Sequence, residues 1–351
     1  MPWRPVLLFF CLFLYGCHTV VIDRADSVGQ ADGFTVNAHR DASRYLPEHT
    51  LAGVAAAHAM GADYIEQDVV LTRDDALIVL HDLYLDAVTD VARRFPERRR
   101  DDGHFYAIDF DLAEIRTLRV NERIRANGKL EFPGRFPLAG SFFRVPTLRE
   151  EITLIQGLNA STGRDVGIYV EPKSPAWHRR QGKDLTARVV RLLAEFGYES
   201  RADRAFLQSF DTDSLKRVRY ELGCDLRLVQ LIGENSWHES PSDFDRLRTE
   251  DGLAEIASFA DGIGPWLPQT MERSAGRSIR SSGLVEAAHR YGFMVHAYTL
   301  RADRLPGAFG SMADAVHALM HLLRLDGVFT DHPDQVLDYL AANRRPGADT
   351  G

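Results

Sequence analysis

FTVNAHRDASRYLPEHTLAGVAAAHAMGADYIEQDVV, the stretch Phe34–Val70, decides the fold class. Its two ends, FTVNAHR and YIEQDVV, are short runs rich in β-branched and apolar residues, which predicts a strand at each end. Between them, Thr50 can cap a helix, LAGVAAAHAM, that ends before Gly61. A strand, a helix and a second strand in this order indicate two parallel strands joined by a helical crossover.

The same alternation continues through the rest of the chain. A helix is predicted to open at Asp211 and end at Gly223, and another, LVEAAHRYG, to end at Gly292. Nearly every strand-like run is followed by a helix-patterned segment, and eight such units are what a closed (β/α)8 TIM barrel requires. The eight predicted strands begin at Phe34, Tyr64, Gly167, Ala205, Leu226, Ala260, Phe293 and Asp326.

One connection is too long for a barrel loop. After the second strand, a turn-like TRDDA and a further β-like run, ALIVLHD, indicate that the chain folds back before the insertion 82–146. We interpret this insertion as a small subdomain or lid, because long insertions on barrels usually lie over the active face. The predicted organisation is a linker over 18–33, a barrel over 34–343 and a tail over 344–351.

The first 17 residues are typical of an export leader, with one charge at Arg4 and an apolar run, Val6–Leu14. That run would span only about 14 Å as a helix, which is too short to cross a bilayer. The string LYGC resembles the lipobox of bacterial lipoproteins, so we expect lipidation at Cys17 and a periplasmic, membrane-anchored protein. Removal of the leader also removes Cys11, so no disulfide framework follows, and Cys224 is expected to be a packed structural thiol.

Composition narrows the possible partners. The chain has 351 residues, of which 45% are hydrophobic and 26% are charged, as in ordinary globular proteins. Its formal net charge is −8, and its basic residues form only short clusters. The broad positive face needed for non-specific nucleic-acid binding is absent, so we expect a small-molecule ligand.

Polar residues gather at the ends of the predicted strands. In a (β/α)8 barrel these carboxyl ends meet at one face, where catalytic groups lie. Glu66 and Asp68 are two residues apart on one strand, so their side chains leave the same face. The candidate site residues are His39, Arg40, Glu66, Asp68, His81, Glu171, Lys173, Gln208, Trp266 and Tyr298.

These residue types suit the cleavage of a phosphate ester. Glu66, Asp68 and Glu171 form an all-oxygen set that suits calcium or magnesium rather than zinc, and we expect calcium ahead of magnesium. Two histidines, His39 and His81, are suited to general acid–base catalysis near neutral pH. Arg40 can grip phosphate oxygens in a bidentate manner, and Lys173 can add a point charge.

The segment Ala38–Asp82 resembles the signature of the glycerophosphodiester phosphodiesterase family, with AHRD, PEHT, EQD and the final HD in the family's order. YVEPKSP, LQSFD, GIGP, VHAYTLR and GVFTDHP follow, so the resemblance covers about Phe34–Leu340. It is nearest to the periplasmic or lipoprotein bacterial enzymes that carry an insertion in this place. Asp41 departs from the pattern, since the family usually has glycine there, and the carboxylate could weaken phosphate binding or point outward.

The resemblance implies hydrolysis of glycerophosphodiesters, such as glycerophosphocholine or glycerophosphoethanolamine, to glycerol 3-phosphate and an alcohol. It implies that His39 and His81 are the acid–base pair and that Arg40 binds phosphate with help from Lys173. The metal ligands would be Glu66, Asp68 and Glu171, and the residues lining the pocket would be Gln208, Trp266 and Tyr298.

Three alternatives remain open on the sequence. A phospholipase D-like enzyme acting on lysophospholipids or sphingolipids would use the same residues, and aromatics of the insertion could supply an apolar trough. A surface lipoprotein could keep the barrel as a scaffold for binding a partner. A barrel isomerase or aldolase would lack the expected phosphate-loop signature and would leave the two histidines unexplained.

Overall fold

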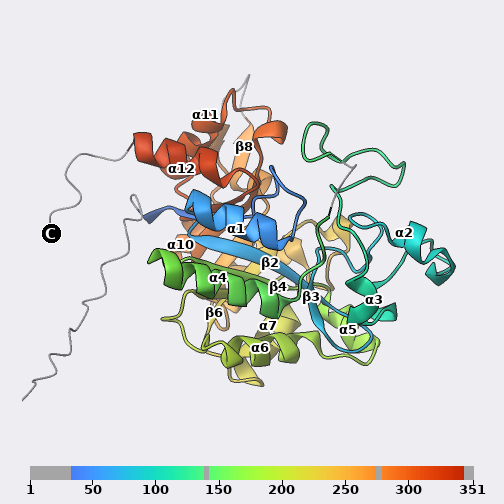
Figure 1. Cartoon of the computed structure of the whole chain (residues 1–351). Coiled ribbons are helices and arrows are strands. Elements are labelled where there is room, and N and C mark those ends of the chain that lie inside the picture. Colours follow the sequence, from blue (N-terminus) through green and yellow to red (C-terminus); the bar gives the residue numbers. More distant parts are fainter. Residues whose placement is uncertain (1–32, 138–141, 274–278, 344–351) are drawn as a thin grey trace, which may run out of the picture.

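The computed structural model describes residues 33–137, 142–273 and 279–343 (Figure 1). The predicted leader with Cys17, nearly all of the linker and the C-terminal tail lie outside the described residues and stay predictions. Within the described part of the chain, no helix combines the length and apolar character needed to span a bilayer.

The predicted closed barrel is confirmed. Each neighbouring pair of its eight strands is parallel, and β1 pairs with both β2 and β11, which closes the ring. The barrel strands are β1 (Thr35–Ala38), β2 (Tyr64–Leu71), β4 (Gly167–Pro172), β5 (Ala205–Ser209), β6 (Arg227–Ile232), β7 (Gly262–Pro265), β10 (Met294–Leu300) and β11 (Gly327–Thr330).

Helices surround the strands, and their ends follow local sequence signals. The Thr50 hydroxyl accepts a hydrogen bond from the Gly53 N–H at the start of α1, and Gly61 ends that helix at φ 94°, a conformation that glycine adopts without strain. Asp211 caps α7 by accepting from the Ser214 N–H. The α-helices of this layer are α1 (Leu51–Met60), α4 (Leu148–Thr162), α5 (Pro175–Arg180), α6 (Leu185–Glu195), α7 (Thr212–Tyr220), α8 (Phe244–Leu247), α9 (Glu250–Ile256), α10 (Leu284–Arg290), α11 (Met312–His317) and α12 (Pro333–Ala342).

The interior of the barrel is filled by large side chains. The Tyr169 and Phe206 rings stack with centroids 4.6 Å apart, and the Phe329 ring packs edge-on against Tyr169. Tyr64 and Val229 complete this cluster. Because the barrel is a packed core and not a pore, polar side chains can gather only at its open end.

The chain folds back after β2, as predicted: β3 (Leu77–Val79) pairs antiparallel with β2. The insertion that follows carries the short helices α2 (Val91–Arg94) and α3 (Leu112–Ile115), and its apolar side chains form a second hydrophobic cluster. A further hairpin joins β8 (Met271–Arg273) to β9 (Ile279–Ser281). Cys224 is free and buried, as expected of a packed thiol.

Candidate active site

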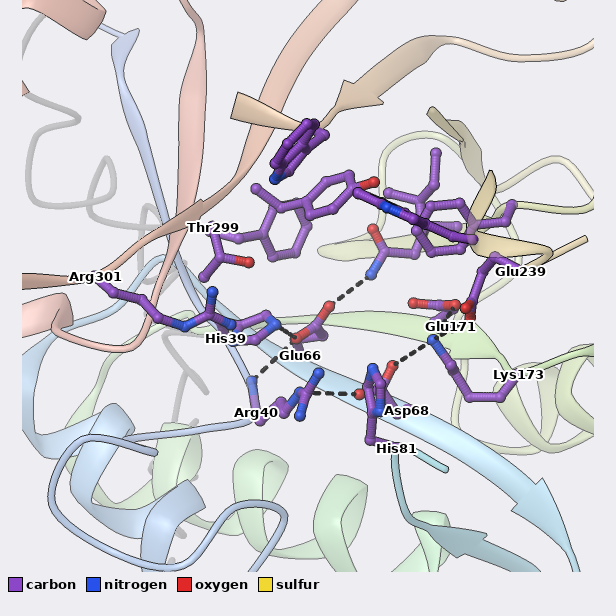
Figure 2. Close-up of a pocket in the computed structure, with 17 residues that line it drawn as sticks. His39, Arg40, Glu66, Asp68, His81, Glu171, Lys173, Glu239, Thr299 and Arg301 are labelled. Atoms are coloured by element: carbon purple, nitrogen blue, oxygen red, sulfur yellow. Dashed lines mark hydrogen bonds and ion pairs between the residues drawn. The ribbon is translucent and has the colours of Figure 1, made fainter. Parts of the chain in front are cut away.

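A cavity of about 260 Å³ opens at the carboxyl ends of the barrel strands. All ten candidate residues predicted from the sequence line it, although nine come from six barrel strands or the segments that follow them, and His81 follows β3. Figure 2 shows the labelled charged side chains converging on one space. Further lining residues that the prediction did not include are Phe210, Leu231, Trp237, Glu239, Thr299, Arg301 and Phe329.

Three buried carboxylates form the acidic centre of the cavity. Glu66, Asp68 and Glu171 each place an oxygen within 4.8 Å of the others. Glu66 is held in place, because its Oε1 accepts from Gln208 Nε2 at 2.9 Å and its Oε2 from the Arg40 backbone N–H at 3.0 Å. Carboxylates this close repel one another unless a cation or a proton compensates them.

The pKa shifts of these three carboxyl groups also indicate that a cation or a proton must compensate their charge. Burial, reinforced by the Asp68 charge, raises the pKa of Glu66 to about 8. Burial also raises the pKa of Glu171 well above its usual range, although Lys173 opposes this rise. Asp68 is ionised, since Lys173 and His81 outweigh its burial and hold its pKa well below the usual range. The centre has more carboxylate than its protein surroundings neutralise, and its oxygen donors fit a hard divalent cation.

Lys173 lies between the acidic groups. Its Nζ is 2.8 Å from Glu171 Oε1, 3.3 Å from Glu239 Oε1 and 3.8 Å from Asp68 Oδ1. Glu239 follows β6, in a segment with no recognisable motif, so the sequence reasoning missed it. Lys173 is thereby kept charged at the edge of the cavity.

His39 is oriented by a carboxylate behind it. Its Nδ1 is 2.7 Å from Asp331 Oδ1, and Asp331 Oδ2 accepts from Arg135 and Arg301, each at 2.7 Å. Burial opposes ionisation of Asp331, yet Arg301 and His39 hold its pKa well below the usual range. A carboxylate can only accept, so the ring proton lies on Nδ1 and the Nε2 lone pair is left free, 3.8 Å from Glu66 Oε2. Burial lowers the pKa of His39 to about 3, so the ring is neutral at pH 7.

His81 has the same arrangement on a different segment. Its Nδ1 is 2.7 Å from Asp82 Oδ1, and Asp82 Oδ2 accepts from Arg123 at 2.6 Å. Burial, with the nearby charge of Arg40, lowers the pKa of His81 to about 4. The cavity therefore contains two neutral imidazoles, each held by a carboxylate at Nδ1.

Arg40 is held by Glu48, and Glu48 is held in turn by Arg123 of the insertion. Its guanidinium contacts Glu48, with both oxygens 3.2 Å from Nη1, and Glu48 also accepts from Arg123 at 2.6 and 3.0 Å. Glu48 belongs to the PEHT string, which was a signal that could have identified it. Arg123 had no such signal, because only folding brings the insertion to the barrel mouth.

The remaining wall of the cavity is aromatic. The Trp237 and Trp266 rings meet edge-to-face with centroids 5.1 Å apart, and the Tyr298 hydroxyl donates to the Ile232 carbonyl at 3.0 Å. Phe210 packs edge-on against Tyr298. The side of the cavity that carries the charged residues can thus bind an anion and a cation, while the aromatic side offers apolar contact.

Asp41 neither lines the cavity nor points outward. Asp41 is fully buried and has a backbone φ of 70°. Its side-chain Oδ2 accepts a hydrogen bond from the Thr50 N–H at 2.9 Å. The outward orientation considered from the sequence is therefore wrong, whereas an effect on phosphate binding stays a prediction. The side chain turns inward, behind the catalytic face.

Comparison with known proteins gives one consistent result. The Glycerophosphoryl diester phosphodiesterase family matches residues 39–335. A glycerophosphodiester phosphodiesterase of Haemophilus influenzae is 40% identical, over 93% of this chain and 95% of that protein. Another, from Treponema pallidum, is 35% identical over 96% of this chain and 99% of that protein.

Solved structures show the same fold. A glycerophosphodiester phosphodiesterase of Agrobacterium tumefaciens matches with a TM-score of 0.56 at 21% identity, over 88% of this chain and 99% of that one. An Oleispira antarctica phosphodiesterase, solved in complex with the product sn-glycerol-3-phosphate, matches with a TM-score of 0.58 at 18% identity, over 88% of this chain and 96% of that one.

Proposed function

Because the chain belongs to the glycerophosphoryl diester phosphodiesterase family, we propose that it hydrolyses glycerophosphodiesters to sn-glycerol 3-phosphate and an alcohol. Glycerophosphocholine and glycerophosphoethanolamine are the proposed substrates. The names of the relatives and the sn-glycerol-3-phosphate bound to the Oleispira enzyme support this product.

The observation that carries the proposal is the pair of carboxylate-held histidines beside an acidic centre. Both His39 and His81 keep Nδ1 bonded to an aspartate, at 2.7 Å in each case. In our proposal, one imidazole takes the proton from the attacking hydroxyl, which belongs to glycerol or to water. The other imidazole takes up a proton at Nε2 when the anionic phosphate is bound, and it gives that proton to the oxygen of the departing alcohol.

Arg40 and Lys173 would hold the phosphate. Arg40 offers a planar set of donors, and Lys173 offers a buried point charge, so both would favour the negative charge that develops on the phosphate oxygens. Glu48 pairs with Arg40 at 3.2 Å, and Glu239 pairs with Lys173 at 3.3 Å, so each cation is held by a carboxylate outside the metal-binding set.

Glu66, Asp68 and Glu171 would hold a divalent cation. Their all-oxygen set suits calcium or magnesium, and we propose calcium ahead of magnesium. A cation held there would polarise a phosphate oxygen and lower the pKa of the attacking hydroxyl.

The size and lining of the cavity favour a small alcohol over a long acyl chain. The insertion aromatics considered for an apolar trough, Phe105, Tyr106, Phe142 and Phe143, are not among the residues lining it. Phe105 and Phe143 pack in the hydrophobic cluster of the insertion. The aromatic side chains that line the cavity are Phe210, Trp237, Trp266, Tyr298 and Phe329, all from the barrel part of the chain, which supports glycerophosphodiesters over lysophospholipids.

A release assay for glycerol 3-phosphate tests the reaction and the cofactor together. Purified full-length protein is treated with EDTA, and then calcium or magnesium is restored in separate samples. We expect glycerophosphocholine turnover to stop with EDTA and to return more fully with calcium. Turnover that survives EDTA would refute the cation, and choline released faster from a lysolipid than from glycerophosphocholine would favour the phospholipase D-like alternative.

We also propose that the protein is exported, on the strength of its leader-like first 17 residues, and anchored through a lipid on Cys17, on the strength of the LYGC string. Cell fractionation of the native chain and a Cys17→Ser variant tests this. The native protein should remain with membranes, and the variant should not. Equal distribution of the two would refute the anchor.

A further inference from the structure

A second polar cluster lies behind the catalytic face. Asp41, His49 and Glu151 each place a donor atom within 4.8 Å of the others. The residues are 0, 3 and 0% exposed, respectively. His49 joins the cluster to the acidic centre, because its Nε2 is 2.8 Å from Asp68 Oδ2.

This cluster contains more hydrogen-bond acceptors than donors. The Asp68 carboxylate accepts a hydrogen bond from His49 Nε2, so Nδ1 is the ring nitrogen left to bind a further ligand. Among the described residues, His49 Nδ1, Asp41 Oδ1 and both carboxyl oxygens of Glu151 are buried without any hydrogen-bond partner. Acceptors are thus gathered in one buried place with no donor among them.

Helix ends explain only part of this placement. Asp41 Oδ2 accepts from Thr50, which caps α1, and Glu151 lies in the first turn of α4, where a negative charge is favourable. Neither interaction reaches the unpaired oxygens. Burial, reinforced by nearby carboxylates, raises the pKa of Asp41 and Glu151 well above the usual range, so a negative charge on either group is costly unless a cation compensates it.

The backbone at Asp41 adds a second argument. Its φ of 70° is a left-handed conformation, which favours glycine and which aspartate tolerates at some strain. A carboxylate buried at a strained position, with one oxygen unpaired, needs a compensating interaction. Glycine at this position would relieve the strain and remove the buried charge at once.

We propose that Asp41, His49 and Glu151 form a second divalent-cation site, separate from the all-oxygen centre and suited to a borderline metal such as zinc. Zinc binds both imidazole nitrogen and carboxylate oxygen, and this cluster offers one such nitrogen with two such carboxylates, whereas Glu66, Asp68 and Glu171 offer oxygen alone. The site is closed to solvent, so its role is structural. It holds His49, and through the Nε2 hydrogen bond it orients Asp68 at the catalytic centre.

Metal retention by the full-length protein tests the proposal without reference to catalysis. The protein is stripped with a chelator, saturated with calcium to fill the all-oxygen centre, exposed to zinc and then desalted. We expect one zinc ion per chain, with an anomalous scattering peak between Asp41 and Glu151 in a crystal at the zinc edge. Zinc should also raise the unfolding temperature of the native protein.

Two variants remove a ligand each with little disturbance of the fold. Asp41→Gly suits the left-handed backbone, and Glu151→Gln keeps the shape of the side chain. Loss of an outer-shell partner alone weakens metal binding by about 10- to 100-fold, so each variant should weaken zinc binding by at least about 100-fold. Zinc should then no longer raise their unfolding temperature.

Glu66→Gln is the matched control. It removes a carboxylate from the all-oxygen centre, so calcium affinity should fall while zinc is still retained. Zinc absent from the native protein would overturn the proposal, with the cluster then compensated by protons. Zinc held equally by Asp41→Gly and Glu151→Gln would also overturn it. Failure of the glycerol 3-phosphate assay would instead bear on the proposed function and leave the zinc count unaffected.

Discussion

Asp331 Oδ1 and His39 Nδ1 are 2.7 Å apart, although the two residues are separated by 292 positions in the chain. The first and last strands of the barrel lie side by side, and their parallel register pairs Ala38 with Thr330, one residue before each partner. Barrel closure therefore sets the orientation of the histidine. Arg135 and Arg301 keep the aspartate ionised and in place.

Asp331→Asn should lower kcat by at least about 100-fold. An asparagine amide can present an N–H to Nδ1, which would shift the ring proton to Nε2 and remove the free lone pair. Steady-state kinetics on glycerophosphocholine with saturating cation measure the effect. Asp303→Asn is the control, because Asp303 also binds Arg135 but does not contact His39. Equal losses in the two variants would contradict the orienting role.

His39→Ala and His81→Ala should each lower turnover by about 100- to 10,000-fold, the range of general acid–base catalysis. Cation affinity should change little, because neither residue belongs to the all-oxygen set. Turnover and calcium binding are measured on the same preparations. His104→Ala is the matched control, since His104 also bonds an aspartate, Asp86, at 2.8 Å but lies outside the cavity. Near-native turnover of either cavity variant would remove that histidine from the mechanism.

Arg123→Met should destabilise the protein by about 3–5 kcal/mol, because it removes the side chain that pairs with both Glu48 and Asp82 at a largely buried site. It should also raise KM, since Glu48 positions Arg40. Arg125→Met, two residues away, removes a half-exposed pair with Glu131 and should cost less than about 1 kcal/mol. Denaturant unfolding of both variants checks this. Similar losses would mean that the insertion does not hold the phosphate site in place.

We predict that His296 makes part of the free energy of unfolding depend on pH. It is buried in the barrel interior, 3.2 Å from the Tyr169 hydroxyl, and burial lowers its pKa to about 4, against about 6.5 in an unfolded chain. Above pH 6.5 the ring is neutral in both states, and its contribution is complete. Between pH 6.5 and 4 the unfolded chain takes up a proton that the folded protein excludes, so stability falls as pH falls.

The His296→Asn variant isolates this contribution. Asparagine keeps an acceptor near the position of Nδ1 and does not titrate. Between pH 7.5 and pH 4.5, native protein should lose on the order of 2 to 3 kcal/mol more unfolding free energy than the variant. Urea unfolding at the two pH values measures the difference. Parallel losses in both proteins would show that His296 does not exclude the proton.

The sequence predicted the barrel because its evidence is local and repeated. Alternating strand-like runs and capped helices, such as the helix from Thr50 to Gly61, recur along the chain and agree with the structure. The ten site residues were predictable for a related reason. Nine of them lie near the carboxyl ends of barrel strands, which parallel closure brings to one face, and the antiparallel return of β3 brings His81 to the same face.

The residues that position those ten side chains could not be predicted from the sequence. Arg123 and Arg135 belong to the insertion, whose sequence has no strand period or motif to indicate which part of the barrel it contacts. Glu239 and Trp237 come from an irregular segment after β6. Side-chain contacts across such separations depend on the complete packing of the chain.

Asp41 shows most clearly what the sequence could determine and what it could not. The sequence by itself determined the barrel, the catalytic face and the residues on it, because strand periodicity and helix caps are local properties of the chain. Only the tertiary structure showed that Asp41 turns inward, where its carboxylate accepts from the Thr50 N–H and lies near His49 and the distant Glu151 of α4. The direction of one side chain depends on distant segments that no local pattern records.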